Sequence, residues 1–306
     1  MSQLIVSTSP HIHSKNNTTR VMLNVIIALL PAITASVWIF GWRALLLVSV
    51  SVATAVLSEI LFNLLCKKSQ TIYDLSAVVT GILLALNVPV TLPVWQMVIG
   101  SAFAIIAVKG LFGGIGQNFA NPAITARIMM LLSFSATMSP KTYPVADVIA
   151  GSTPLNSIRT GELHLIPDTS ELLLGRYGGS LGETCSIALL LGGAYMLIRH
   201  IITWHAPVAF IGTVFLGSFV LGLPPVVEIL SGGLLIGAIF MATDYSTTPI
   251  TKNGRLIFGL GCGIITLLIR KWGSVPEGVS YAILFMNILT PYIEKWTVKR
   301  PLGGAK

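Results

Sequence analysis

Charged residues are scarce in this chain of 306 residues, where they make up 10% of the sequence while 54% is hydrophobic. An ordinary soluble domain carries roughly a quarter charged residues. So few charges could not cover the surface of a soluble protein of this size. The composition excludes a soluble domain and indicates a protein whose solvent is the lipid bilayer.

Cysteine is also rare, and Cys66, Cys185 and Cys262 lie far apart in the sequence. Without a CxxC spacing the chain alone offers no conventional iron–sulfur or zinc site, although a site shared with a partner chain stays open. His11 and His13 could bind a metal together, but a solvated N-terminal arm explains them better. We therefore expect no metal site in this chain.

The net charge of +8 does not indicate nucleic acid, because Lys and Arg stand singly or in pairs at the ends of apolar runs. That placement is typical of membrane topology. With both termini inside, the cytoplasmic side holds thirteen Lys and Arg residues against three in the short loops of the other side. The sequence predicts a multi-pass protein of the cytoplasmic (inner) membrane with its N- and C-termini in the cytoplasm.

About ten apolar segments are long enough to cross a bilayer, or to do so as short helices buried by their neighbours. They are residues 21–40, 44–65, 72–88, 94–110, 122–136, 182–200, 204–222, 226–243, 255–271 and 277–294. Residues 137–181 form the one long hydrophilic stretch, and we expect them outside. The predicted fold class is an all-α polytopic membrane protein.

Five spans precede the hydrophilic stretch and five follow it, so the two sets must run in opposite directions. We therefore predict two inverted five-helix repeats, within 1–136 and 182–306, around an extracytoplasmic loop at 137–181. Two motif pairs suggest the repeat: Leu-Asn-Val-Pro at 86–89 with Leu-Gly-Leu-Pro at 221–224, and Asn-Pro at 121–122 with Thr-Pro at 248–249.

A glycine-rich turn, Phe-Gly-Gly-Ile-Gly-Gln-Asn-Phe-Ala-Asn-Pro-Ala at 112–123, joins the fourth and fifth spans. No strand precedes it, so a nucleotide-binding loop is excluded. Asn121 suits the N-cap of the next helix and Pro122 its first position, which explains the turn as helix punctuation. Asn118 and Asn121 also place amide groups beside a helix N-terminus, and a ligand site fits better.

The end of the eighth span carries five Ser and Thr hydroxyl groups, the hydroxyl of Tyr245 and the carboxyl of Asp244 in residues 243–251. A solvated inner loop and a ligand site are equally good interpretations, and the similarity to the Asn-Pro turn favours the second. Glu59 is the deepest carboxylate. A charge at the bilayer centre costs about 2.5–3.5 kcal/mol on insertion scales, so Glu59 is a candidate for a cation path. Its position six residues from the helix end allows it to reach the interface instead.

Taken together, these segments and the Ser-Pro-His at 9–11 resemble the D subunits of Rnf complexes, the membrane-bound ferredoxin:NAD oxidoreductases. The chain is more distantly similar to the B subunits of sodium-pumping NADH:quinone oxidoreductases. The resemblance covers nearly the whole chain. It implies a component of a translocase that works with the A, B, C, E and G subunits of the Rnf complex and moves Na⁺ or H⁺.

The family implies two flavins. One is FMN, joined by a phosphodiester to a threonine in an outer motif Asp-x-x-Ser/Thr-Gly-Ala-Thr. Asp147, Gly151 and Thr153 match this motif, while Ala150 and Ser152 depart from it. The following Pro-Leu favours Thr153 as the attachment site, and Ser152 is the rival hydroxyl.

The second implied cofactor is riboflavin, held noncovalently among the helices near the cytoplasmic side. The Asn-x-x-Asn pair, Asn118 and Asn121, matches the family's Asn-Pro turn, and Asp244 is a further candidate for flavin binding. Flavins pass electrons singly, so the implied chemistry of the chain is an electron relay across the membrane, with no catalytic residue of its own. The alternative is a channel or secondary transporter on the same repeat, which would purify colourless.

Overall fold

The computed structural model describes residues 17–138, 153–162, 164, 166–175, 177–183, 185–273 and 277–298. In these ranges the secondary structure is helical, and no strand occurs. The helices before the hydrophilic stretch are α1 (Thr18–Phe40), α2 (Trp42–Leu65), the 3₁₀ turn η1 (Ile72–Asp74), α3 (Ser76–Leu86), α4 (Val94–Phe103), its π-helical continuation η2 (Ala104–Gly110), α5 (Pro122–Ser133) and α6 (Ser135–Met138).

Two short helices, α7 (Pro154–Thr160) and α8 (Thr169–Leu174), belong to the hydrophilic stretch. The helices after it are α9 (Ser186–Ile198), α10 (His205–Val220), α11 (Pro225–Leu230), α12 (Leu234–Ile236), its π-helical continuation η4 (Gly237–Met241), α13 (Lys252–Trp272) and α14 (Val279–Thr297). Each of the ten predicted spans therefore contains helix, and the eighth is a pair of short helices separated by a break at 231–233.

Among the described residues, three helices, α1, α2 and α13, are long and apolar enough to cross a membrane by themselves. Large apolar side chains cover the outside of the bundle, among them Trp38 at 91% exposure and Val220 at 83%. Such a surface fits lipid and not water. The predicted fold class, an all-α polytopic membrane protein, is confirmed.

The third span is only eleven residues of helix, which is about 16 Å and well short of a hydrocarbon core of about 30 Å. Nearly all of α3 is buried, and the chain continues to the next helix as the irregular segment 87–93. The guanidinium Nε of Arg43 donates to the carbonyl of Val90 at 2.8 Å, and Asn87 donates back to the carbonyl of Leu83 at 2.7 Å. Irregular backbone at this depth is satisfied by protein groups, as the bilayer requires.

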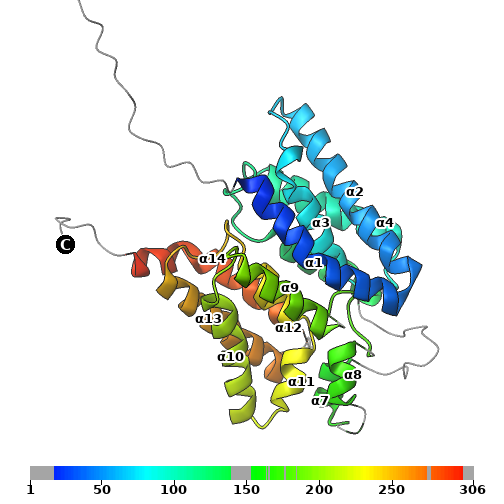
Figure 1. The fold of residues 1–306 in the computed structure, drawn as a ribbon, viewed down its shortest axis with the longest axis vertical. Coiled ribbons are helices and arrows are strands. Elements are labelled where there is room, and N and C mark those ends of the chain that lie inside the picture. The colour runs from blue at the N-terminus through cyan, green and yellow to red at the C-terminus, as the bar shows by residue number, and fades with distance from the viewer. Residues whose placement is uncertain are drawn as a thin grey trace, which may run out of the picture.

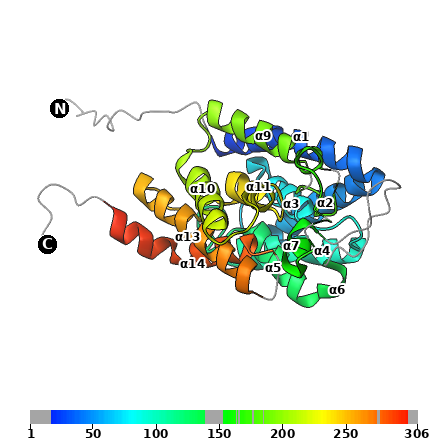
Figure 2. The ribbon, with the colours of Figure 1, turned by 90° about the horizontal axis from the view of Figure 1, so that it is seen from below.

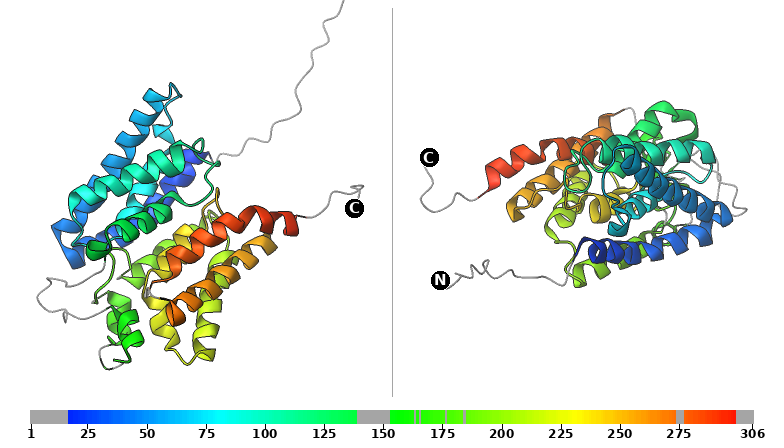
Figure 3. Two further views of the ribbon diagram at one scale, coloured as in Figure 1. Left: turned by 180° about the vertical axis from the view of Figure 1, so that it is seen from behind. Right: turned by 90° about the horizontal axis from the view of Figure 1, so that it is seen from above.

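The two halves share part of their packing. Helix α2 contacts α3 and α4, and α10 contacts α11 and α13 in the same way. The halves meet where α1 lies along α9 (Figure 2) and where α5 contacts α14 (Figure 3). Part of the packing is thus shared between helices five spans apart, which fits the spacing of the predicted inverted repeat.

The motif pairs chosen to support that repeat are wrong. Residues 86–89 follow the third span but 221–224 follow the seventh; 121–122 open the fifth span but 248–249 precede the ninth. Spans four apart run in the same direction, whereas an inverted repeat relates spans five apart. The paired motifs are thus not equivalent positions, but each pair lies at one face of the bundle.

The bundle has two faces that matter for the site. The start of α1, the end of α2 and the end of α14 lie at the upper left of Figure 1, and we call this the N-terminal face. Helices α7 and α8 lie at the lower right, and we call this the loop face.

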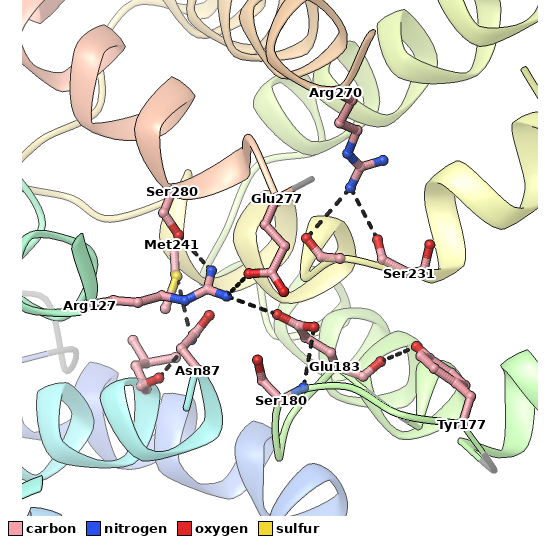
Figure 4. A network of polar contacts seen from close by, with 12 residues as sticks. Asn87, Arg127, Tyr177, Ser180, Glu183, Ser231, Met241, Arg270, Glu277 and Ser280 are labelled. Carbon is pink, nitrogen blue, oxygen red and sulfur yellow. Dashed lines mark hydrogen bonds and ion pairs between the residues drawn. The ribbon is translucent and has the colours of Figure 1, made fainter. Parts of the chain in front are cut away.

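A buried charged cluster joins the halves (Figure 4). Arg127 on α5 donates to Ser280 at 2.6 Å, to Glu183 at 3.2 Å and to Glu277. Nearby, Arg270 on α13 bonds the carboxylate of Glu228 at 2.6 Å and backbone carbonyls at the end of α11. A guanidinium there satisfies carbonyls that the broken helix leaves unpaired.

Candidate functional site

The two π-helical stretches, η2 and η4, each run into a break in the helix pattern at the N-terminal face. The first break, residues 111–121, is the predicted glycine-rich turn, and the second, 242–251, is the predicted hydroxyl-rich turn. Left-handed φ angles at Gly113 (111°), Gly114 (101°) and Gly116 (88°) fold the first break back on itself, a conformation that favours glycine. π-Helical turns inside α-helices are frequent at functional sites.

Both breaks line one open pocket, which we call the central pocket. Its empty space is about 800 Å³, open solvent included. Its walls are residues of α1, α3, η2, η4, both breaks and the 196–202 region: Val21, Met22, Val25, Ser76, Val79, Thr80, Leu83, Lys109, Ile115, Asn118, Asn121, Pro122, Met196, Ile202, Phe240, Thr243, Asp244, Tyr245 and Ser246. The structure therefore brings Asn118, Asn121 and Asp244 together, as the sequence predicted.

The side chains of Asn118 and Asn121 have different hydrogen-bonding roles. Asn121 is the N-cap of α5, and its Oδ1 accepts from the backbone N–H of Ala123 at 3.0 Å and of Ile124 at 3.4 Å. The side-chain Oδ1 of Asn118 is buried and meets no hydrogen-bond partner among the described residues. A buried acceptor without a partner is costly, so Asn118 is the side chain of this turn that a ligand would satisfy.

Asp244 is committed to its own turn. Its Oδ2 accepts from the hydroxyls of Ser246 at 3.1 Å and Thr247 at 3.2 Å. Burial raises the pKa of this carboxyl above its usual range, and the hydrogen bonds oppose the rise. Asp244 thus shapes the second break and also places a carboxyl at the pocket wall.

Glu59 does not line the central pocket. It is 5% exposed on α2, and its Oε1 accepts from Lys109 Nζ at 2.5 Å and from Thr71 Oγ1 at 2.7 Å. It lines a neighbouring pocket at the end of α2. Glu59 therefore does not reach the interface alone but is held in a buried ion pair.

The sequence does not predict Lys109 as a site residue, because its position at the end of an apolar run places it among the thirteen basic residues expected on the cytoplasmic side. Lys109 is 4% exposed, as is Arg127, and Arg270 is 7% exposed. Buried residues are not loop charges, so without Lys109 and Arg127 the cytoplasmic side holds eleven basic residues instead of thirteen. Without Arg270 the short loops of the other side hold two instead of three. The excess of basic residues on the cytoplasmic side, and with it the predicted orientation, is unchanged. The feature of the sequence that could have indicated a role for Lys109 is a single Lys at the end of an apolar run.

Thr153 lies on the loop face, apart from the central pocket. It is the half-buried N-cap residue of α7, and within the described residues its side chain makes no capping hydrogen bond. The other predicted members of its motif, Asp147, Gly151 and Ser152, lie outside the described residues, as do His11 and His13.

The model of the NQR2, RnfD, RnfE family matches residues 5–303. The chain belongs to this family. Among its relatives, the D subunit of the Na⁺-translocating ferredoxin:NAD⁺ oxidoreductase complex of Acetobacterium woodii is 45% identical over 99% of this chain and 96% of its own length. The D subunit of the proton-translocating complex of Clostridium ljungdahlii is 37% identical over 95% of this chain and 94% of its own length.

A third family member, the D subunit of the ion-translocating oxidoreductase complex of Alcanivorax borkumensis, is 35% identical over 98% of this chain and 97% of its own length. The central pocket thus occurs in a chain of the NQR2, RnfD, RnfE family. The relatives of this chain are named as subunits of ion-translocating oxidoreductase complexes.

Proposed function

We propose that this chain is the flavin-carrying membrane subunit of an ion-translocating ferredoxin:NAD⁺ oxidoreductase complex of the Rnf type. The observation that carries the proposal is the 45% identity, over 99% of the chain, with the D subunit of such a complex. On this proposal the partners are the other Rnf subunits. The location is the cytoplasmic membrane, with the N-terminal face inside.

The lining of the central pocket supports the proposal that this chain binds riboflavin noncovalently. Side chains of α1, α3 and η4 offer apolar surface for an isoalloxazine ring, and both breaks contribute polar groups to the lining. Asn118, whose buried Oδ1 lacks a partner among the described residues, would hold a ring or ribityl donor, and Asn121 would fix the turn that carries it. When bound, the flavin supplies one-electron chemistry.

Thr153 is proposed to carry FMN through a phosphodiester. Its hydroxyl is at a half-buried position on the loop face, where the first turn of α7 leaves it uncommitted among the described residues. A site at this face and a site at the N-terminal face would place redox groups at both ends of the bundle. The proposed activity is an electron relay across the membrane, coupled to translocation of Na⁺ or H⁺, with Glu59 on the ion path.

Purified complex tests the proposal. The denatured band of this chain should fluoresce under ultraviolet light in the parent and in Ser152→Ala but not in Thr153→Ala. Acid extracts of Asn118→Leu should contain less riboflavin with covalent FMN unchanged, because an unpaired polar group costs about 1–3 kcal/mol, or roughly 5- to 150-fold in affinity. A colourless parent protein would favour the channel or transporter instead.

A further inference from the structure

Lys109 lies in the wall between two pockets. Lys109 lines the central pocket and also a second pocket at the end of α2, which has about 650 Å³ of empty space, open solvent included. The second pocket is lined by Glu59, Phe62, Asn63, Lys68, Ser69, Thr71, Ile105, Lys109, Gly110, Gly113 and Gly114. The residue comes from the π-helical stretch η2, whose widened turn precedes the first break. One buried cation is thus shared by two solvent-connected spaces.

The hydrogen bonds of Lys109 form a short polar chain. Its Nζ donates to Glu59 Oε1 at 2.5 Å and to Ser76 Oγ at 2.5 Å, and Ser76 in turn donates to Asp74 at 2.6 Å. Asp244 also lines the central pocket, and Lys68 lines the second pocket. Lys109 is the one cationic side chain among the described residues that line the central pocket.

Glu59 is only partly satisfied by this arrangement. Its Oε1 is shared by Lys109 and Thr71, but its Oε2 is buried and has no hydrogen-bond partner among the described residues. A buried carboxylate depends on its counter-ion, and removing one partner of such a pair is strongly destabilising. Anything that draws Lys109 away therefore leaves Glu59 in need of another cation.

We infer that Lys109 links the two pockets electrostatically, so that negative charge arriving in the central pocket competes with Glu59 for its ammonium. The inference builds on the proposed function, because it needs a redox ligand there. One electron from a donor such as a reduced flavin adds one negative charge in the central pocket, and that donor is oxidised by one electron. Glu59, less neutralised by Lys109, takes up one monovalent cation, Na⁺ or H⁺, through the second pocket.

The arithmetic of charge then balances. One electron enters the central pocket, one cation enters the second pocket, and the total charge around Lys109 is unchanged. By linkage, a cation that binds Glu59 more tightly when the central ligand is reduced must raise the reduction potential of that ligand. Lys109 is a positioning residue in this scheme, because it acts on the ligand through charge and not through bond making.

Substitution of Lys109 in the assembled complex tests the inference through the reduction potential of the noncovalent flavin. The parent potential should rise with Na⁺ concentration or with falling pH, according to which ion Glu59 binds. Lys109→Met should keep riboflavin but favour the reduced form about tenfold less, a fall of about 59 mV for one electron. The reduction potential of Lys109→Met should also no longer depend on the cation concentration. Lys109→Arg should keep most of the parent's potential and most of its cation dependence.

A paired variant keeps the test sharp if Lys109→Met alone fails to fold. Glu59→Gln/Lys109→Met removes both buried charges at similar volume, so no carboxylate is left unpaired. This variant should contain riboflavin and show the lower, cation-independent potential. A riboflavin-loaded variant with the parent's potential and cation response overturns the inference alone. A parent complex without riboflavin overturns the proposed function as well.

Discussion

Arg127 should be the most sensitive single position for the stability of the whole bundle. Its guanidinium donates to Glu183 and Glu277, two carboxylates that would otherwise face each other, and to Ser280. Glu183 is 3% exposed, so water cannot replace the arginine. Arg127→Met keeps the apolar stem but leaves two carboxylates uncompensated, which should cost about 3–5 kcal/mol.

A matched control separates charge from hydrogen bonding at this cluster. Ser280→Ala removes one of the hydrogen bonds of Arg127 and should cost about 0.5–1.5 kcal/mol. Adding Glu183→Gln to Arg127→Met should restore part of the loss, because one uncompensated charge disappears. The order of stability is therefore parent, Ser280→Ala, the double variant, then Arg127→Met.

A thiol-reactive fluorogenic dye can report this order during heating in detergent. Cys262 is fully buried in α13, so it reacts only when the bundle opens, whereas Cys66 is exposed and should be replaced together with Cys185. If Arg127→Met exposes Cys262 at the parent's temperature, the cluster does not hold the halves together and the argument from uncompensated charge is wrong.

Three further outcomes follow from the structure. A cysteine at the exposed Thr160 should be labelled from outside the cell, whereas Asn253→Cys and the native Cys66 should not; the reverse would overturn the orientation. Asn121→Ala should lose about 1 kcal/mol of stability with the N-cap, while Asn121→Asp should keep it, as heating with the dye will show. Gly192→Ala should destabilise the α1–α9 contact by about 1–3 kcal/mol in the same assay, since its Cβ would lie 2.2 Å from a carbonyl oxygen of α1.

The sequence predicts the membrane class and the approximate spans because hydropathy depends on local composition alone. It also predicts that Asn118 and Asp244 share a site. In the predicted topology each follows a span that runs from the outside to the cytoplasm, so both lie at the cytoplasmic face. The sequence also identifies Asn121 as the N-cap of the fifth span, but it does not show that the Oδ1 of Asn118 lacks a partner among the described residues, because that depends on how the turn folds.

Pairing across the bundle is what sequence reasoning misses. Glu59 and Lys109 are 50 residues apart, and Arg127 and Glu277 are 150 apart, so nothing local relates them. Single charges in apolar segments do signal that partners exist, because unpaired charges are expensive there. Which charge pairs with which is set by the packing of α2 on η2 and of α5 on α14.

The short helices also constrain how the chain enters the membrane. Helices α3 and α9 have eleven and thirteen residues, too few to partition into a bilayer unaided, whereas α1 and α2 can insert as a hairpin. The later segments must wait at the translocation channel, or beside the first hairpin, until neighbours can shield their free backbone groups. Biogenesis of this protein is thus a cooperative assembly, and a ribosome stalled after α3 would leave a segment with no stable place in lipid.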